Sequence, residues 1–211
     1  MKNEIYRNIL IKFTDESRDW LSTYFKAGDR NVSSDTHILV ATPKFDDDVA
    51  DYSDKIKSVF PKERNQFAKI KIETLENVLK KVPKIKPKEF VDCEACDGEG
   101  EVEADFYWEG KHYGILGGCP ICEGRADFEI TLEDADDVFD DSKGIKILES
   151  GFKPSHLDSL VMIAKMLGQD SIQIFFQDSK NIATHFLIGD VFVVVQPTNN
   201  SIFFFLDEIE E

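Results

Sequence analysis

Two cysteine pairs constrain this chain more than any other feature of its sequence. The segment from Cys93 to Gly124 opens with Cys93-Glu-Ala-Cys96 and closes with Cys119-Pro-Ile-Cys122, and all four cysteines of the protein lie in these two turns. Each Cys-x-x-Cys turn presents two thiolates, and two such turns supply four soft ligands in the tetrahedral geometry of a structural zinc ion. The 22 residues between Cys96 and Cys119 slightly exceed the usual ribbon spacing and suit a short hairpin.

Two disulfides or a redox pair are the alternatives to a metal site. We favour zinc because nothing in the sequence indicates secretion and a redox Cys-x-x-Cys needs only one pair. Four thiolates also bind iron, although zinc is the usual ion in such ribbons. His112 is either a replacement ligand or, as we expect, an ordinary loop histidine. A closed four-sulfur site has no open coordination position, so its role would be structural.

The two turns resemble the Cys-x-x-Cys-x-Gly-x-Gly repeats of DnaJ-type co-chaperones. The first turn matches in full through Gly100, whereas Ala126 stands where the second repeat would have its last glycine. Only two repeats are present where that family has four, and the sequence contains no His-Pro-Asp signature. The resemblance implies one zinc ribbon and not a co-chaperone.

Length and composition indicate a folded, water-soluble chain. The 211 residues suit one domain with an insertion or two small domains, and 17 phenylalanines with 42% apolar residues can form a core. No stretch approaches the roughly 20 apolar residues of a membrane span, and the N-terminus lacks the apolar run of a signal peptide. We therefore expect a cytoplasmic protein that does not contact membranes.

Charge is distributed unevenly along the chain. The formal net charge is −16, yet residues 55–90 contain eleven Lys or Arg against four Glu, and residues 133–141 contain six carboxylates. A net negative charge argues against a protein that simply coats nucleic acid. The segregation fits either a basic surface on an acidic protein or a solvated basic helix and loop.

The hydrophobic pattern predicts an α+β fold. Apolar residues of 154–167 recur with helical spacing, Pro154 stands in the first turn, and Gly168 is a natural C-cap. We expect helices after the capping residues 14–17, at 74–82 with Thr74 as cap, and at 154–167, and strands at 9–13, 24–26, 32–34, 37–41, 69–72, 126–132, 145–148, 171–176, 182–188, 191–195 and 201–206. Helices and strands are not in β-α-β alternation, so a parallel sheet is not expected.

Three segments resemble parts of bacterial DNA sliding clamps, the DNA polymerase III beta subunit. They occur along this chain in the same order as in that family. Residues 152–197 resemble its last module, although Lys153 stands where the family usually caps the helix with Asn. Residues 52–82 are similar to the segment between modules and the first module helix. Val32–Val40 resembles an Ala-Thr-Asp-Gly-His-Arg-Leu strand pair, with Asp35 and His37 matching and the glycine and arginine absent.

The resemblance implies a clamp-like module, with two helices packed on antiparallel sheets and an inserted four-cysteine zinc ribbon. The implied divisions are a partial module or cap at 1–66, a module at 67–206, the ribbon at 91–126 and an acidic tail at 207–211. Clamps do no chemistry, and lysines on their helices contact the phosphates of encircled duplex DNA. The corresponding candidates are Lys80, Lys81, Lys84, Lys153 and Lys165. Solvated helix lysines are the alternative, and Met162 and Met166 on the same helix favour a packed interface.

The sequence leaves two functions open. The first is a non-catalytic clamp-like accessory protein, of phage or mobile-element origin, that binds double-stranded DNA and a replication or other protein partner and forms homo-oligomers. The second is a protein-docking module in which the zinc ribbon presents Tyr107, Trp108 and Tyr113. We expect no enzyme, because the four histidines are scattered along the sequence and no nucleophile elbow or phosphate-binding glycine loop is present.

Overall fold

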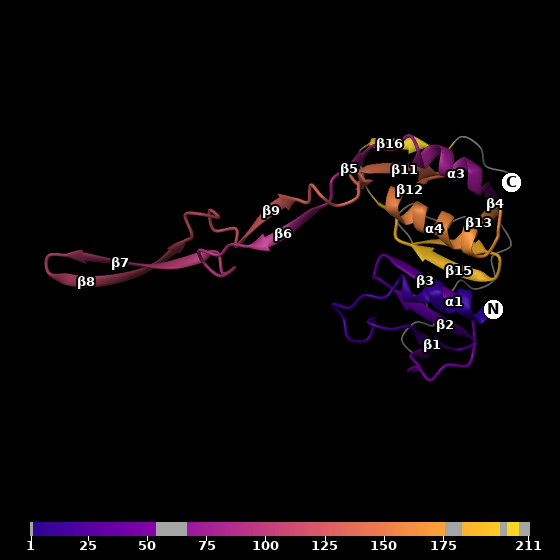
Figure 1. The fold of residues 1–211 in the computed structure, drawn as a ribbon, viewed down its shortest axis with the longest axis horizontal. Helices are drawn as coiled ribbons and strands as arrows, with labels where there is room; N and C mark the ends of the chain where they lie inside the picture. The colour runs from indigo at the N-terminus through magenta and orange to yellow at the C-terminus, as the bar shows by residue number, and fades with distance from the viewer. Residues whose placement is uncertain (1, 54–66, 176–182, 199–201, 207–211) are drawn as a thin grey trace. The chain divides into compact units, whose positions relative to one another are not determined.

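The computed structural model describes residues 2–53, 67–175, 183–198 and 202–206. The chain divides into two compact units, one formed by Met1–Pro83 with Phe139–Glu211 and the other by Lys84–Val138. We call the first the body and the second the ribbon unit (Figure 1). The ribbon unit contains both cysteine pairs.

One seven-stranded antiparallel sheet forms the centre of the body, in the order β1-β2-β3-β15-β14-β13-β4. Its strands are β1 (Phe25–Ala27), β2 (Arg30–Ser34), β3 (Ile38–Pro43), β4 (Phe67–Lys71), β13 (Ser171–Phe175), β14 (Thr184–Ile188) and β15 (Val191–Val195). The turn predicted around Gly28 is confirmed, and Gly28 adopts a positive φ of 65° there. The predicted α+β class is also confirmed, because helices and a mainly antiparallel sheet make up the body.

Two similar halves share this sheet. Helix α1 (Lys2–Ile11) precedes the three strands β1 to β3, and helix α4 (Pro154–Met166) precedes the three strands β13 to β15. The last strands of the two halves, β3 and β15, pair antiparallel, with Val40 opposite Val193. Contacts between distant parts of the sequence therefore complete the sheet.

Helices cover one face of the sheet and enclose the main core. Helix α3 (Ile72–Leu79) contacts α4, and the core includes Leu75, Leu160 and Val193. Neighbouring strand residues point to opposite faces, so Phe192 joins a second, smaller cluster with Leu21 and others on the opposite side. Both faces of the sheet thus have their own apolar cover.

A smaller sheet completes the body, with β11 (Lys143–Ile147) at its centre. Strand β12 (Ser150–Phe152) pairs with β11 antiparallel, and β16 (Ile202–Phe205) pairs with it parallel. The strand expected at 201–206 is therefore confirmed in its described part. Its partner comes from the segment just before helix α4, which the local sequence pattern does not reveal.

The strand expected at 9–13 and the helix expected after 14–17 are both wrong. The strand expected at 9–13 is instead the end of α1 and the turn after it, because Tyr6, Ile9 and Leu10 lie on one buried face of the helix. Phe13, in the turn that follows, is buried in the same core. The helix expected after 14–17 does not form. The Asp15 amide donates to the Leu21 carbonyl at 2.8 Å, which closes a loop and brings Leu21 into the second cluster.

Helix α3 begins two residues before the predicted cap. Its N-cap is Lys71, which makes no side-chain capping bond, and Thr74 lies inside the helix. Strand β4 runs directly into the helix, and the Ile72 amide donates to the Asp170 carbonyl at 2.9 Å. The prediction for α4 is confirmed at both ends, since Pro154 is its first residue and Gly168 follows the C-cap with a φ of 64°.

The ribbon unit consists of paired strands and turns. Strand β6 (Lys88–Asp92) pairs with β9 (Asp127–Thr131), and β7 (Glu101–Trp108) pairs with β8 (Lys111–Gly118). Strand β5 (Lys84–Ile85) pairs with β10 (Val138–Phe139), where the division between the units crosses the chain. The expected strand at 126–132 is thus confirmed as β9. Within the described part of the chain, none of the helices has the length and apolar character needed to cross a membrane.

Candidate functional site

The four cysteines meet between the two ladders of the ribbon unit. Cys93 follows β6 and Cys119 follows β8, while Cys96 and Cys122 lie three residues further along each turn. All four side chains are buried, and their sulfur atoms lie within 4.8 Å of one another. The sequence prediction that two distant turns contribute to one site is therefore confirmed.

The sulfur separations fit a bound metal ion and not disulfides. The Sγ atoms of Cys93 and Cys119 are 3.9 Å apart, and those of Cys96 and Cys122 are 3.7 Å apart. A disulfide requires about 2.0 Å. Four sulfurs at about 2.3 Å from a central zinc ion would be about 3.8 Å from one another in a tetrahedron. These two separations match that value, so the four sulfurs could hold a metal ion.

The two turns have closely similar backbone bonding. The Gly98 amide donates to the Cys93 carbonyl and the Gly124 amide to the Cys119 carbonyl, each at 3.1 Å. Both glycines have positive φ, 74° and 77°, a conformation that costs glycine little. The amide of Cys119 also donates to the Gly100 carbonyl at 2.8 Å, which ties one turn to the other.

The two turns carry different residues at one equivalent position, Gly100 in the first and Ala126 in the second. Both residues have a positive φ, 76° and 74°. The Gly100 amide donates to the Cys96 sulfur at 3.2 Å. A Cβ on Gly100 would lie 2.8 Å from the Gly124 carbonyl oxygen, closer than real contacts. Glycine is therefore required at position 100, whereas position 126 accommodates a methyl group in a conformation that L residues rarely adopt.

The environment affects the acidity of the thiols. Burial raises the pKa of Cys96 to about 11. At Cys122 burial acts in the same direction, but the Ala126 amide and the neighbouring thiols outweigh it and lower the pKa to about 7. One thiolate thus forms readily near neutral pH, and a bound cation would displace the remaining protons.

His112 lies in the β7–β8 hairpin, on a different part of the unit from the cysteines. Its Nε2 atom is 2.9 Å from Asp105 Oδ1, and its ring contacts Tyr107. Four cysteines already complete a tetrahedral set. His112 therefore behaves as a surface histidine of the hairpin.

The three aromatic residues expected to bind a partner are all exposed, but they do not share one face. Tyr107 of β7 lies opposite His112 of β8. Trp108 of β7 lies opposite Lys111, and Tyr113 of β8 lies opposite Phe106. Successive residues of a strand alternate between faces, so Tyr107 is on one side of the hairpin and Trp108 and Tyr113 are on the other. Phe106 and Ile115 extend the second face, which the sequence alone did not reveal because it did not show the register.

The five candidate DNA-binding lysines have different surroundings. Lys80 and Lys81 are exposed at the end of α3, Lys153 is the N-cap of α4, and Lys84 belongs to β5 of the ribbon unit. Lys165 Nζ lies 2.5 Å from Glu76 Oε1, which raises the pKa of Lys165 and lowers that of Glu76. This ion pair between α4 and α3 partly neutralises the charge that would face a phosphate.

Met162 and Met166 do not form an exposed interface on their own. Both are half-buried and pack against the main core of the body. Methionine often fills irregular gaps of this kind. Their apolar character is therefore explained by contacts within the chain.

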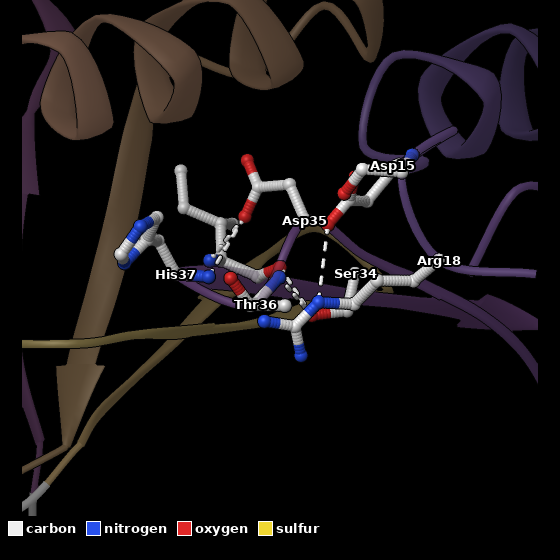
Figure 2. Close-up of polar contacts among 8 residues, drawn as sticks. Asp15, Arg18, Ser34, Asp35, Thr36 and His37 are labelled. Atoms are coloured by element: carbon white, nitrogen blue, oxygen red, sulfur yellow. Dashed lines mark hydrogen bonds and ion pairs between the residues drawn. The ribbon is translucent and has the colours of Figure 1, made fainter. Parts of the chain in front are cut away.

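The turn at Asp35 and His37 organises the backbone between β2 and β3. Figure 2 shows Asp35 Oδ1 accepting from the amides of His37 and Ile38, at 2.9 and 2.7 Å. Thr36 has a φ of 76°, which is uncommon for a β-branched residue. The carboxylate is thus used in the turn, and the His37 ring instead stacks on the buried His156, with ring centroids 5.9 Å apart.

No protein-family model matches the chain. No curated protein matches it either. Solved structures similar to it include the DNA polymerase III subunit beta of Borrelia burgdorferi, with 14% identity, a TM-score of 0.49, and coverage of 93% of this chain and 61% of that one.

The sliding clamp of Bartonella birtlesii is also similar, with 12% identity, a TM-score of 0.48, and coverage of 94% of this chain and 64% of that one. The sliding clamp of Caulobacter crescentus has 11% identity, a TM-score of 0.47, and coverage of 92% of this chain and 64% of that one. This chain spans less than two thirds of the length of each. These proteins belong to the family that the sequence resembles. Whether this chain shares their activity stays a prediction.

Proposed function

We propose that this chain is a non-catalytic, clamp-like accessory protein that binds a protein partner through its ribbon unit. The order of the three clamp-like sequence segments supports the clamp-like part of this proposal. The exposed aromatic hairpin supports the docking part, since Tyr107 and Trp108 are 75% and 64% exposed. Aromatic side chains are common anchors of protein interfaces and are otherwise rarely left in water.

The ion that we assign to the cysteine site is zinc. Four buried sulfurs with edges of 3.7 and 3.9 Å support this choice, because zinc takes tetrahedral thiolate sets. Its role would be structural: the ion would hold the two turns together at the base of the hairpin. Elemental analysis of the purified protein would identify the ion, and one zinc per chain is the expected result.

A shortened hairpin tests the docking function. Replacing residues 102–117 with Asn-Gly joins Glu101 to Gly118, which are opposite one another, through a two-residue turn and leaves the four cysteines in place. The full chain should capture a protein from extracts of its native host that the shortened variant does not. Equal capture by both, with zinc content unchanged, would contradict the proposal.

Association with duplex DNA is a second candidate, favoured by the excess of lysine in residues 67–88, which contain seven lysines and two glutamates. Changing Lys80, Lys81 and Lys84 to Glu should abolish binding of a fluorescent duplex, and wild-type binding should weaken steeply with salt. Binding that survives the triple change would exclude these three lysines as the DNA contacts. Light scattering with and without DNA would also show whether several chains assemble.

A further inference from the structure

We infer that one face of the β7–β8 hairpin binds a cationic, amphipathic segment of the partner protein. This inference rests on the proposed docking function and adds the face that is used and the chemistry of the partner. The face, which we call the apolar hairpin face, is defined by the register of the two strands. It consists of Val102, Ala104, Phe106 and Trp108 of β7, and Lys111, Tyr113, Ile115 and Gly117 of β8.

The apolar hairpin face is continuous across both strands. Ala104 lies opposite Ile115 and Phe106 opposite Tyr113, and the rings of Phe106 and Tyr113 stack at 5.2 Å. Phe106, Trp108 and Ile115 are 45%, 64% and 53% exposed. Val102, at the base, packs against the cysteine cluster, so the metal site and this face are joined.

Leaving this apolar face exposed to water is energetically unfavourable. Two strands with one apolar side are at best marginally stable alone, and a contiguous exposed apolar patch marks an interaction site. In the part of the chain that the structure describes, β7 and β8 pair only with each other. The hairpin is anchored by the cysteine site at its base, and its apolar face therefore remains available for a partner.

The charge around the face selects the partner. The opposite face of the hairpin carries Glu101, Glu103 and Asp105, and the whole ribbon unit has 16 carboxylates against five Lys or Arg, a formal net charge of −11. Three of those five cations already pair with carboxylates, at 3.1 Å for Lys86, 2.6 Å for Lys88 and 3.8 Å for Arg125. The ribbon unit that surrounds the apolar hairpin face is thus strongly acidic, and Lys111 is the one charged residue on the face itself.

This acidic charge excludes two other occupants. A second copy of the chain would bring another ribbon unit of charge −11 against the first, and nucleic acid would bring phosphates. A segment with apolar residues and flanking Lys or Arg would place its apolar side chains on the hairpin face and its positive charges near the carboxylates of the ribbon unit. Complementary charge also accelerates association and makes it sensitive to salt.

Synthetic peptides test the chemistry directly. The probes are a 14-residue peptide of alternating Leu and Lys, the same peptide with Glu in place of Lys, and one with Ser in place of Leu. Binding to the full zinc-loaded chain is measured by calorimetry and, in a Trp20→Phe variant, by the fluorescence of Trp108. The Leu/Lys peptide should bind at least about tenfold more tightly than either control, a difference of about 1.4 kcal/mol.

Neighbouring residues on opposite faces of β8 supply a matched pair of variants. Ile115→Ser removes an apolar side chain from the proposed face, and Leu116→Ser removes one from the opposite face, where it is 65% exposed. Because both side chains are exposed, both variants should fold and keep their zinc. Ile115→Ser should weaken peptide binding at least about fivefold, and Leu116→Ser less than about twofold.

Several outcomes would overturn the inference. Equal effects of Ile115→Ser and Leu116→Ser would show that the peptide responds to charge alone. Preference for the Glu peptide, dimerisation lost in Ile115→Ser, or binding of single-stranded DNA lost in that variant would each identify a different occupant. If the shortened hairpin still captures its partner, the docking function itself fails. If capture is lost but the face variants behave like wild type, only the present inference fails.

Discussion

In the body, helices α3 and α4 bury leucine and valine against a seven-stranded sheet, whereas the most deeply buried side chains of the ribbon unit are its four cysteines. In the ribbon unit, every residue of which the structure describes, Val102 and Phe128 are the apolar side chains partly buried against the cysteines. The body can therefore be stabilised by apolar burial, and the ribbon unit lacks a core large enough to do the same. The two units should respond to different perturbations.

Removal of the proposed zinc ion should have the largest effect, and only on the ribbon unit. Structural zinc contributes about 10–16 kcal/mol of apparent binding free energy in small metal-dependent folds. Chelation, or Cys119→Ser, should therefore unfold residues 84–138 and leave the body folded. Hydrogen exchange by mass spectrometry resolves the two units. Loss of protection in α4 and β15 after chelation would break the distinction between them.

A core substitution should have the opposite selectivity. Leu160 is fully buried between α4 and the sheet, so Leu160→Ala should lower the free energy of unfolding of the body by about 2–5 kcal/mol. Denaturant unfolding followed by far-UV circular dichroism measures this loss. Zinc affinity, from competition with a chromophoric chelator, should stay unchanged. A matched change at the exposed Asp158, to Ala, should affect neither quantity much.

Within the ribbon unit, the two cysteine turns should respond oppositely to changes at equivalent positions. Gly100→Ala forces a Cβ to 2.8 Å from a carbonyl oxygen and should weaken zinc binding by more than about tenfold. Ala126→Gly relieves a positive φ and should increase the stability of the unit by up to about 1 kcal/mol. Chelator competition ranks the three proteins. Equal losses would mean that the two turns are not constrained differently.

Mild acid should destabilise the body through His156, with the smallest effect of the four. Burial lowers the pKa of His156, and the charges of Lys153 and His37 lower it further. The carboxylates of Asp141 and Asp35 act in the opposite direction and raise this pKa, but the net shift is downward. The unfolded state therefore binds a proton more readily, and stability falls as the pH drops below about 6.5, by at most about 1.4 kcal/mol per pH unit. His156→Phe should flatten this dependence, measured by denaturant unfolding of the body between pH 7.5 and 5.5.

Local patterns in the sequence predicted what depends on near neighbours. The spacing of the cysteines predicted one four-sulfur site, and the apolar spacing of 154–167 with Pro154 and Gly168 predicted α4. The turn at Gly28 and the strands of the last meander were predicted in the same way. Within each Cys-x-x-Cys turn, in α4 and in the turn at Gly28, the residues that specify the structure lie within a few positions of one another, so the signal is present in a short window. The two cysteine turns are separated by 22 residues, and only their repeated spacing linked them.

Tertiary structure decided the features that depend on distant partners. Residues 9–13 alternate weakly like a strand, yet Ile9 and Leu10 join Tyr6 on the buried face of α1 because that face packs into the core. The pairing of β3 with β15 and the ion pair of Lys165 with Glu76 join segments that are far apart in the sequence.

The register of β7 and β8, like the long-range contacts of the body, is information that only the folded chain supplied. A shift of one residue would exchange the two faces of the hairpin, and the sequence alone did not show that Trp108 and Tyr113 share a face from which Tyr107 is excluded. The sequence by itself determined the four-cysteine cluster that could hold a metal ion, the main helix and the acidic composition. Pairing between strands decided which side chains form a surface, because register is a property of two segments together.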